Sequence, residues 1–222
     1  MSKKYYSVAV GRKIGIFNNW KDCQESVIGF KNAIYKSFST LEEAKLFLFN
    51  FKKSNKEISD ELINDIQVKN SVKLDLKENI YPIFVDGSFN KKNQKIGYGI
   101  LIINGLNSNN WIIFSNKLNQ NEYQKYKSHL NVAGEIIGTI NAIQFCIKNN
   151  LKKIKIYYDY LGIEKWITKE WEAKSSISLM YLEFIEKNKQ KLELLFQKVR
   201  AHNDIEYNNI ADELAKKSVS SN

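Results

Sequence analysis

The sequence has few cysteines and no long apolar run, and both absences narrow the class of protein. In its 222 residues no stretch approaches the roughly 18 consecutive apolar residues that cross a membrane. The first residues, MSKKYY, form no hydrophobic signal region. The two cysteines, Cys23 and Cys146, lie far apart and outside any CxxC motif, so neither a disulfide framework nor a zinc site is indicated. We therefore expect a cytoplasmic protein with two reduced thiols and no membrane contact.

The sequence does contain a normal hydrophobic content and an excess of positive charge. Hydrophobic residues make up 43% and charged residues 26% of the chain, which is enough for one good core and a small second one. Residues 1–52 hold nine Lys and Arg against four Asp and Glu, residues 53–79 hold five against six, and residues 80–222 hold twenty against fourteen. The net charge of +10 favours an anionic partner. Two basic domains therefore flank a nearly neutral connector.

The connector, residues 53–79, is predicted to be a flexible linker. It is polar and lacks aromatic residues, and only the stretch SDELINDIQV, capped by Ser59, offers a possible short helix. As a coil it would span roughly 30 Å on average. Such a linker would hold one domain near the other domain's substrate and so raise the effective concentration.

Residues 1–52 predict a small sheet with two helices. Tyr6, Val8 and Val10 alternate before GRKIG and the apolar run then resumes, which is the pattern of a hairpin. A helix from Trp20 to about residue 28, a strand around 33–35 and a helix from Thr40, whose TLEE is a capping box, follow. Basic and aromatic residues interleave on the presumed edges: Arg12, Lys13, Trp20, Tyr35 and Lys36. Taken alone, the two aromatic residues could equally be half-buried core residues.

The stretch YYSVAVGRKIGIFNNWKDCQESVIGFKNAIYKSFSTLEEAKLFL closely resembles the viroplasmin-like hybrid-binding domain at the N-terminus of many type 1 ribonucleases H. The resemblance implies that a loop meets the 2′-hydroxyls of an RNA strand through its backbone, while an aromatic and basic pocket grips the DNA strand. It assigns Arg12, Lys13, Ile14 and Gly15 to the RNA side and Trp20, Tyr35 and Lys36 to the DNA side. Ser37 stands where relatives often carry a second lysine, which would weaken the phosphate clamp.

Residues 80–222 predict a mixed sheet with helices on both faces. Three runs, IYPIFVDGSF, KIGYGILIING and NWIIFSNKL, suit an antiparallel meander. A helix over 133–148 follows, with Ile136, Ile140, Ile143 and Ile147 on one stripe. The strand KIKIYYD, helices near 161–166 and 178–189, the strand LELLFQKV and a helix from about Asn209 complete the chain. This order of elements after a meander is typical of a mixed α/β domain.

Four acidic residues stand at the ends of these elements. Asp86 and Asp159 each follow a short β run, and Glu135 and Asp212 lie in the predicted first turns of helices. Taken singly, each has an ordinary structural role as a turn residue, a helix cap or a partner of the helix dipole. If the two strands are parallel neighbours, the carboxylates gather and repel one another. Divalent ions such as Mg²⁺ would relieve that repulsion, and two ions about 4 Å apart can cleave a phosphodiester.

The stretches VDGS, NVAGE, YYD and AHNDIEYNNIADELA occur in the order and approximate spacing of the ribonuclease H type 1 catalytic domain, a resemblance over roughly residues 80–218. It implies an RNase H-like fold with a five-stranded mixed sheet flanked by helices. It also assigns two Mg²⁺ ions, or Mn²⁺ in their place, to Asp86, Glu135, Asp159 and Asp212. Further roles fall to His202 in proton handling and product release, and to Asn131, Ser88 and Asn208 in substrate contact.

Two features depart from that family pattern. Tyr160 follows Asp159 where many relatives have serine or threonine. The segment WITKEWEAKSSIS is short and mixed in charge, whereas single-domain relatives carry a basic protrusion that grips the hybrid. Residues 1–48 would supply the missing grip.

The expected function is that of an endoribonuclease that cuts the RNA strand of RNA–DNA hybrids and leaves 5′-phosphate and 3′-hydroxyl ends. Duplex DNA lacks the 2′-hydroxyl that the chemistry requires, and duplex RNA carries it on the strand that should be deoxy. The expected partner is the hybrid duplex, bound by a monomer that needs no other protein. Two alternatives stay open: a hybrid-binding protein without catalysis, and an integrase-like nuclease of the same fold that cuts DNA.

Overall fold

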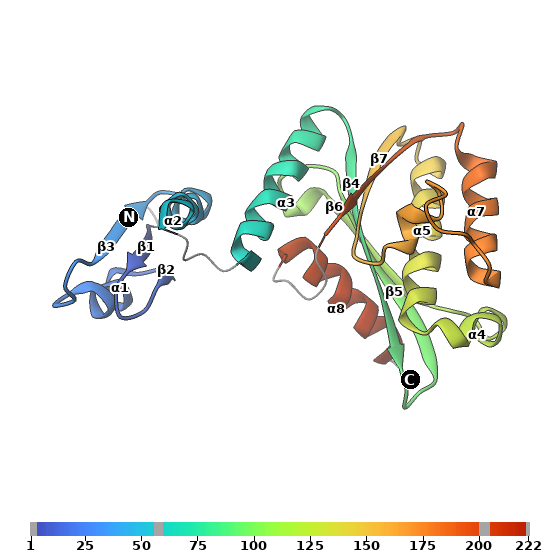
Figure 1. Ribbon diagram of the computed structural model, residues 1–222, viewed down its shortest axis with the longest axis horizontal. Coiled ribbons are helices and arrows are strands. Elements are labelled where there is room, and N and C mark those ends of the chain that lie inside the picture. Colours follow the sequence, from blue (N-terminus) through green and yellow to red (C-terminus); the bar gives the residue numbers. More distant parts are fainter. Residues whose placement is uncertain (1–3, 56–59, 200–204, 221–222) are drawn as a thin grey trace. The chain divides into compact units, whose positions relative to one another are not determined.

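The computed structural model of the protein describes residues 4–55, 60–199 and 205–220. The chain forms two compact units that divide between Gln67 and Val68 (Figure 1). The smaller unit contains a three-stranded sheet and the larger one a five-stranded sheet. Both sheets agree with the number of strands that the sequence predicts.

The smaller unit is an antiparallel sheet covered by two helices. β1 (Tyr5–Val10) lies between β2 (Gly15–Phe17) and β3 (Ile34–Phe38). The helices are α1 (Trp20–Val27) and α2 (Leu41–Asn55). Val8, Cys23 and Val27 form its small core. The hydroxyl of Ser7 on β1 donates to the carbonyl of Ala44 at 2.9 Å and so ties α2 to the sheet.

The larger unit is a mixed sheet with the strand order β6-β5-β4-β7-β8. β4 (Tyr81–Asn90), β5 (Lys95–Ile103) and β6 (Trp111–Lys117) form an antiparallel meander, whereas β7 (Lys153–Tyr158) and β8 (Glu193–Lys198) continue parallel to β4. The helices are the part of α3 (Asp60–Lys77) from Val68 onward, α4 (Gln120–Tyr126), α5 (Asn131–Lys148), α6 (Gly162–Lys165), α7 (Ser176–Asn188) and α8 (Glu206–Ser220), with short 3-10 turns at Ser108–Asn110 and Lys127–His129. The predicted mixed fold is confirmed.

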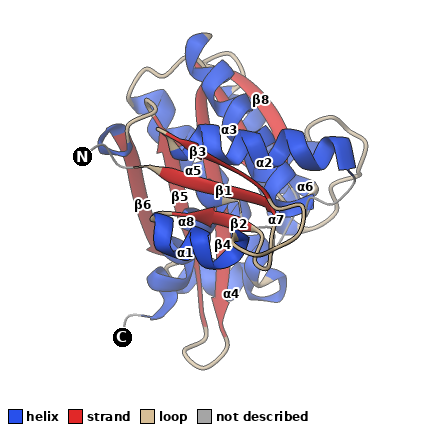
Figure 2. Ribbon diagram, turned by 90° about the vertical axis from the view of Figure 1, so that its left-hand side faces the viewer, coloured by secondary structure: helices blue, strands red, loops and turns tan. Residues whose placement is uncertain are grey.

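Helices cover both faces of this sheet (Figures 1 and 2). Ile83 and Val85 of β4 belong to the core beneath α5 and α7, whereas Phe84 between them belongs to the core beneath α8. The alternation follows from the pleat, which sends successive side chains to opposite faces. The isoleucine stripe predicted for α5 is confirmed, since Ile136, Ile140 and Ile143 all lie in the first of these cores.

Residues 60–77 form a helix where the sequence predicted a coil with at most a short helical stretch. Val68 and Val72 of α3 are buried in the core on the α8 face. Their apolar partners come from β4, β5 and β7. These partners are distant in the sequence, so the composition of residues 53–79 did not indicate that the two valines are buried. Tertiary packing of two valines therefore stabilises a helix that local propensity did not indicate.

Helix boundaries also differ from the prediction. α5 begins at Asn131 and α8 at Glu206, two and three residues earlier than expected, so Glu135 and Asp212 lie in second turns rather than first turns. The helix dipole, which acts within the first turn, is therefore not what favours these acids. α4 was not predicted, although the capping box of Asn119 and Glu122 marks its start.

Two expectations drawn from scarce features of the sequence can be compared with the structure. Cys23 and Cys146 are free and buried, as predicted for reduced thiols. Among the helices within the described ranges, none combines the length and the apolar character needed to cross a membrane.

Candidate active site

The register between β4 and β7 brings two aspartates to the same end of the sheet. Phe84 pairs with Tyr157 in the last step of this parallel ladder. Asp86 and Asp159 each lie two residues further along, where β7 has ended while β4 continues to Asn90 in its pairing with β5. The expectation that these two strands are parallel neighbours is confirmed.

Glycines allow α5 to approach β4 closely enough to deliver a third carboxylate. A Cβ atom on Gly87 would lie 2.2 Å from the carbonyl oxygen of Asn131 and 2.6 Å from the amide nitrogen of Glu135. A Cβ atom on Gly134 would lie 2.3 Å from the carbonyl oxygen of Gly97. No side chain fits between the helix and the strands there. Glu135, only 7% exposed, is thereby held against the strand end.

Burial and mutual repulsion raise the pKa values of two of these acids. Desolvation raises the pKa of Asp86 to about 7, helped by the charges of Asp159 and Asp212 and opposed by the hydrogen bond from the Gly87 N–H at 2.7 Å. Desolvation, followed by the charges of Asp159 and Asp86, raises the pKa of Glu135 to about 9. The negative charges of these carboxylates therefore raise one another's pKa values, which is typical of a cluster that binds a cation.

Asp212 faces the cluster from α8. A Cβ atom on Gly99 of β5 would lie 2.1 Å from the carbonyl oxygen of Ala211, so this helix also lies directly on the sheet. The Asp212 carboxylate accepts a hydrogen bond from Lys216 Nζ at 2.5 Å, and this bond raises the pKa of the lysine. Lys216 was missed by sequence reasoning, although its position four residues after an aspartate on a helix is a recognised pairing.

The donor set fits a hard divalent cation such as Mg²⁺. All four predicted ligands are carboxylates, which is the chemistry that Mg²⁺ prefers. Glu135 Oε2 is buried and has no hydrogen-bond partner within residues 4–55, 60–199 and 205–220. A buried oxygen without a partner is costly, and a cation would satisfy it.

The side chains are not yet gathered into a finished ligand set. Within the part of the chain that the structure describes, no three acidic, histidine or cysteine side chains already stand where one ion could bind them. Asp212 is paired with Lys216 instead.

The other predicted site residues are placed as follows. Ser88 lies on β4 beside Gly87 and is partly buried. Asn131 is the exposed first residue of α5, and Asn208 is 8% exposed on α8. His202 lies outside the described residues. Tyr160, the departure from the family pattern, packs edge-on against Trp166 with ring centroids 5.6 Å apart, and burial and the charge of Glu135 raise its pKa.

In the smaller unit an exposed aromatic cluster occupies the predicted DNA side. The Trp20 ring lies 5.5 Å from that of Tyr6 and 5.9 Å from that of Tyr35. Trp20 is 39% and Tyr35 45% exposed, so neither is a core residue. Lys36 Nζ lies 5.6 Å from the centre of the Phe38 ring. The exposed rings of Trp20 and Tyr35 can contact sugars, whereas Lys36 follows Tyr35 on β3 and projects to the opposite face of the sheet, toward Phe38.

The predicted RNA-side loop is held by the end of α1. The Arg12 guanidinium donates to the carbonyls of Ile28 at 2.6 Å and Glu25 at 3.1 Å. The Lys13 N–H donates to Ser26 Oγ at 2.8 Å, and the Ser26 hydroxyl donates back to the Lys13 carbonyl. The Arg12 side chain is therefore engaged by helix carbonyls, whereas Ile14 is 48% exposed. Sequence reasoning missed Ser26, which no motif marked.

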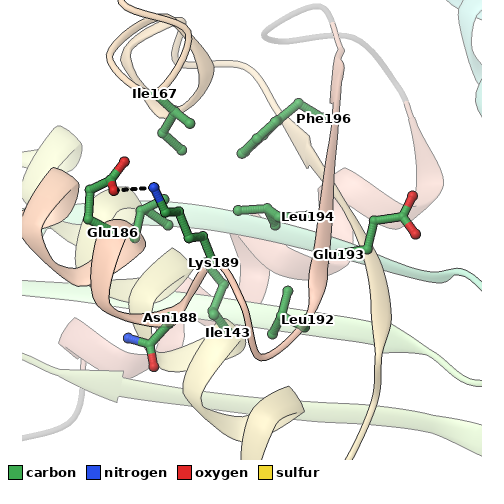
Figure 3. Close-up of a pocket in the computed structure, with 10 residues that line it drawn as sticks. Ile143, Ile167, Glu186, Asn188, Lys189, Leu192, Glu193, Leu194 and Phe196 are labelled. Atoms are coloured by element: carbon green, nitrogen blue, oxygen red, sulfur yellow. Dashed lines mark ion pairs between the residues drawn. The ribbon is translucent and has the colours of Figure 1, made fainter.

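A separate cavity of about 330 Å³ lies on the α5 and α7 face (Figure 3). Ile143, Leu194 and Phe196 line it. An ion pair between Glu186 and Lys189, at 2.6 Å, also borders it. None of the predicted site residues is among the residues that line it.

Two family descriptions match the chain, and both agree with the resemblance drawn from its motifs. "Ribonuclease H1 N-terminal domain" matches residues 4–48 and "RNase H" matches residues 78–220. Ribonuclease H of Crithidia fasciculata is 52% identical over 48 residues, or 22% of this chain and 10% of that protein. Ribonuclease H of Saccharomyces cerevisiae is 48% identical over 44 residues, or 20% of this chain and 13% of that protein. The aligned segments thus span about a tenth of these relatives' lengths.

Two ribonucleases H1 are among the solved structures that match part of the chain. RNase H1 from Halobacterium salinarum is 14% identical with a TM-score of 0.49, and the match covers 63% of this chain and 97% of that one. LC11-RNase H1 in complex with an RNA/DNA hybrid is 16% identical with a TM-score of 0.49, and the match covers 63% and 96%. Since the "RNase H" description covers well over half of its residues, the chain belongs to the RNase H family.

Proposed function

We propose that the protein is an endoribonuclease that hydrolyses the RNA strand of RNA–DNA hybrids. The observation that carries the proposal is the convergence of Asp86 of β4, Glu135 of α5 and Asp159, which follows β7, in a chain of the RNase H family. A group of acids that raise one another's pKa values at a strand end is poorly explained by a purely structural role.

Divalent ions bound there, two Mg²⁺ or in their place Mn²⁺, would activate a water molecule and stabilise the departing oxygen, leaving 5′-phosphate and 3′-hydroxyl ends. Asp86, Glu135, Asp159 and Asp212 would hold them. Asp86 and Glu135 must lose their protons before they can bind a cation, because their raised pKa values favour the protonated form near neutral pH. The Gly87 N–H orients Asp86 through its hydrogen bond to Oδ1.

Other residues of the larger unit would serve the substrate. Lys216 restrains Asp212 until a cation competes for that carboxylate. Ser88, Asn131 and Asn208 would contact the substrate, and His202 would handle a proton and assist product release. These assignments rest on the family resemblance and on the places of the three described residues near Asp86, Glu135 and Asp212 in the sequence.

The smaller unit would grip the hybrid on both strands. By the family resemblance, backbone groups of residues 12–15 would meet 2′-hydroxyls of the RNA. The N–H groups of Arg12 and Lys13 donate to Ser26, and Ile14 is exposed. Trp20, Tyr35 and Lys36 would contact the DNA strand. Contacts to sugars and phosphates predict weak sequence preference. The cytoplasmic location and the monomeric state that the sequence suggested stay predictions.

The test is cleavage of a labelled RNA–DNA hybrid with Mg²⁺, Mn²⁺ or EDTA, run beside duplex RNA, duplex DNA and single-stranded RNA. We expect metal-dependent cutting confined to the RNA strand of the hybrid. Asp86→Asn should abolish cutting while hybrid affinity is retained, and this affinity shows that the variant is folded. Tight hybrid binding without cutting would favour the non-catalytic alternative, and cutting of duplex DNA would favour the DNA nuclease.

A further inference from the structure

The C-terminal half of α3 packs on the sheet that carries the candidate active site. Val68 and Val72 are buried together with Phe84 of β4, Leu101 of β5 and Tyr157 of β7. This half of α3 precedes residue 78, where the RNase H family match begins. A segment outside the family description is thus an integral part of the larger unit's core.

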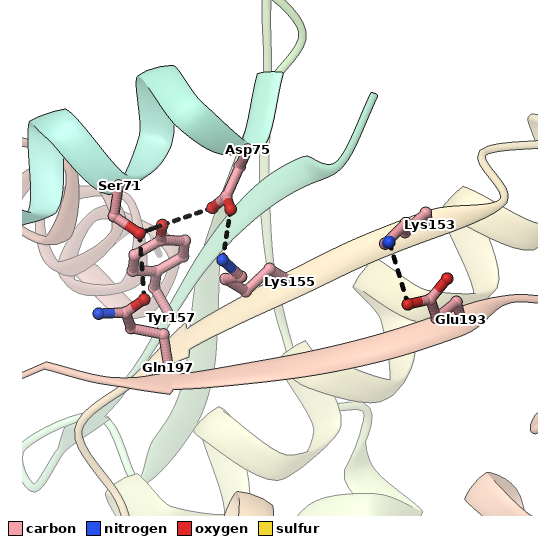
Figure 4. Close-up of polar contacts among 7 residues, drawn as sticks. All are labelled: Ser71, Asp75, Lys153, Lys155, Tyr157, Glu193 and Gln197. Carbon is pink, nitrogen blue, oxygen red and sulfur yellow. Dashed lines mark hydrogen bonds and ion pairs between the residues drawn. The ribbon is translucent and has the colours of Figure 1, made fainter. Parts of the chain in front are cut away.

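Polar contacts connect this half of α3 to β7 (Figure 4). The Tyr157 hydroxyl donates to Asp75 Oδ2 at 2.6 Å and lies 2.8 Å from Ser71 Oγ. Asp75, only 3% exposed, also forms an ion pair with Lys155. The Ser71 hydroxyl donates to Gln197 of β8 at 3.1 Å. A buried carboxylate with two partners fixes a geometry more strictly than apolar contact does, because a displaced charge would lose both partners.

Tyr157 also contacts the strand that carries Asp86. Its ring stacks on Phe84, with centroids 4.6 Å apart and planes 21° from parallel. These two residues form the last pair of the ladder between β4 and β7. Beyond them no further ladder pair joins these two strands. Asp86 is held further by the ladder between β4 and β5, which continues to Asn90, so this last pair is the final β4–β7 contact before Asp159.

We infer that Tyr157 is a positioning residue for the Asp86 and Asp159 carboxylates and that Ser71 and Asp75 of α3 hold it in place. The inference rests on the proposed function, since it concerns the same acids. On this inference α3 helps to position the catalytic carboxylates and does not serve only to connect the two units. Without this support the end of β7 could shift by small amounts relative to β4, and the geometry of a reaction site is sensitive to such shifts.

The test compares two full-length variants that lose the same group. Tyr157→Phe removes the hydroxyl bound to α3 and keeps the ring. Tyr181→Phe is the matched control, because Tyr181 is also fully buried in the larger unit and its hydroxyl donates to the Ile163 carbonyl at 2.9 Å rather than to α3. Thermal unfolding, Mn²⁺ affinity by calorimetry, and kcat and KM on a labelled hybrid are measured for both variants and for the unchanged protein.

Both variants should unfold at a similarly lowered temperature, but only Tyr157→Phe should weaken Mn²⁺ binding and lower kcat, by roughly tenfold, with KM unchanged. Equal Mn²⁺ affinity and equal kcat in the two variants would overturn the inference. If Tyr157→Phe does not fold, Ser71→Ala, which removes one of the two contacts, should show the same pattern in smaller measure. Failure of the proposed function can be told apart from failure of this inference, because the unchanged protein would then not cleave the hybrid. The comparison of Mn²⁺ affinities would still decide whether Tyr157 positions the acids.

Discussion

Replacing Asp86 by asparagine should stabilise the metal-free protein while it destroys activity. Burial raises the pKa of Asp86 from 3.8 to about 7. In the unfolded chain the carboxyl ionises near its ordinary pKa, whereas in the folded protein it holds its proton up to about pH 7. The folded state thus binds more protons in this interval, so its stability falls as the pH rises from about 4 to 7 and is constant above. An asparagine at this position cannot ionise.

The magnitude follows from the size of the pKa change. A rise of roughly three pKa units corresponds to at most about 4 kcal/mol at pH 8. The new amide must find its own hydrogen-bond partners in a crowded site, which offsets about 1–3 kcal/mol. We expect a net gain of about 1–3 kcal/mol in the free energy of unfolding, or roughly 3–8 °C in Tm for a unit of this size.

The assay is thermal unfolding of the unchanged protein and of Asp86→Asn in EDTA at pH 5, 6, 7 and 8. The Tm difference should grow from pH 5 to 7 and then level off, and added Mg²⁺ should stabilise the unchanged protein more than the variant. Glu183→Gln is the control, because Glu183 is exposed and its pKa is lowered by Lys187. A Tm difference that stays the same at every pH, or a variant that is less stable at pH 8, would refute the reasoning.

Three further predictions concern the cation, the helix contact and the loop. The Mg²⁺ concentration for half-maximal cleavage should fall as the pH rises from 6 to 9, because protons on the two acids with raised pKa values compete with the cation; a flat titration series would contradict this. Gly87→Ala should lower the free energy of unfolding by about 1–3 kcal/mol in urea, because its Cβ would clash with the backbone of α5; unchanged stability would show that α5 can move away. Ser26→Ala should weaken hybrid binding with kcat unchanged, since it removes the hydrogen bonds that hold the loop at residues 11–15. Ser7→Ala is the control, because it removes a buried hydroxyl contact elsewhere in the smaller unit. Equal hybrid affinities of the two variants would contradict a role for the loop's hydrogen bonds.

Several parts of the fold followed from short patterns. The apolar run in residues 81–85 indicated a strand, and the structure sends its successive side chains Ile83 and Phe84 to separate cores. The isoleucine spacing in residues 136–147 indicated the buried face of α5. Such patterns are readable because the periods of a strand and a helix repeat within a few residues. The capping box at Asn119 and Glu122 was equally readable and was overlooked.

Other features were not readable in that way. α3 looked like a polar linker because its two buried valines stabilise the helix only by packing on a sheet whose strands lie elsewhere in the chain. The contact of the Arg12 side chain with the carbonyls at the end of α1 was not indicated by the sequence either. In both places the partner lies in another element, so the local spacing of residues in the sequence does not indicate the contact.

The sequence by itself determined which residues can do chemistry: four carboxylates in recognisable contexts, an aromatic and basic face, and the periodic segments that carry them. Only the tertiary structure decided how the described residues act together. Desolvation and neighbouring charge set the pKa values of Asp86 and Glu135, and these exist only once strands and helices have packed. The contact between Asp75 and Tyr157 joins residues 82 positions apart. Burial and long-range contact are properties of the folded chain, because they depend on which distant segments exclude water from one another.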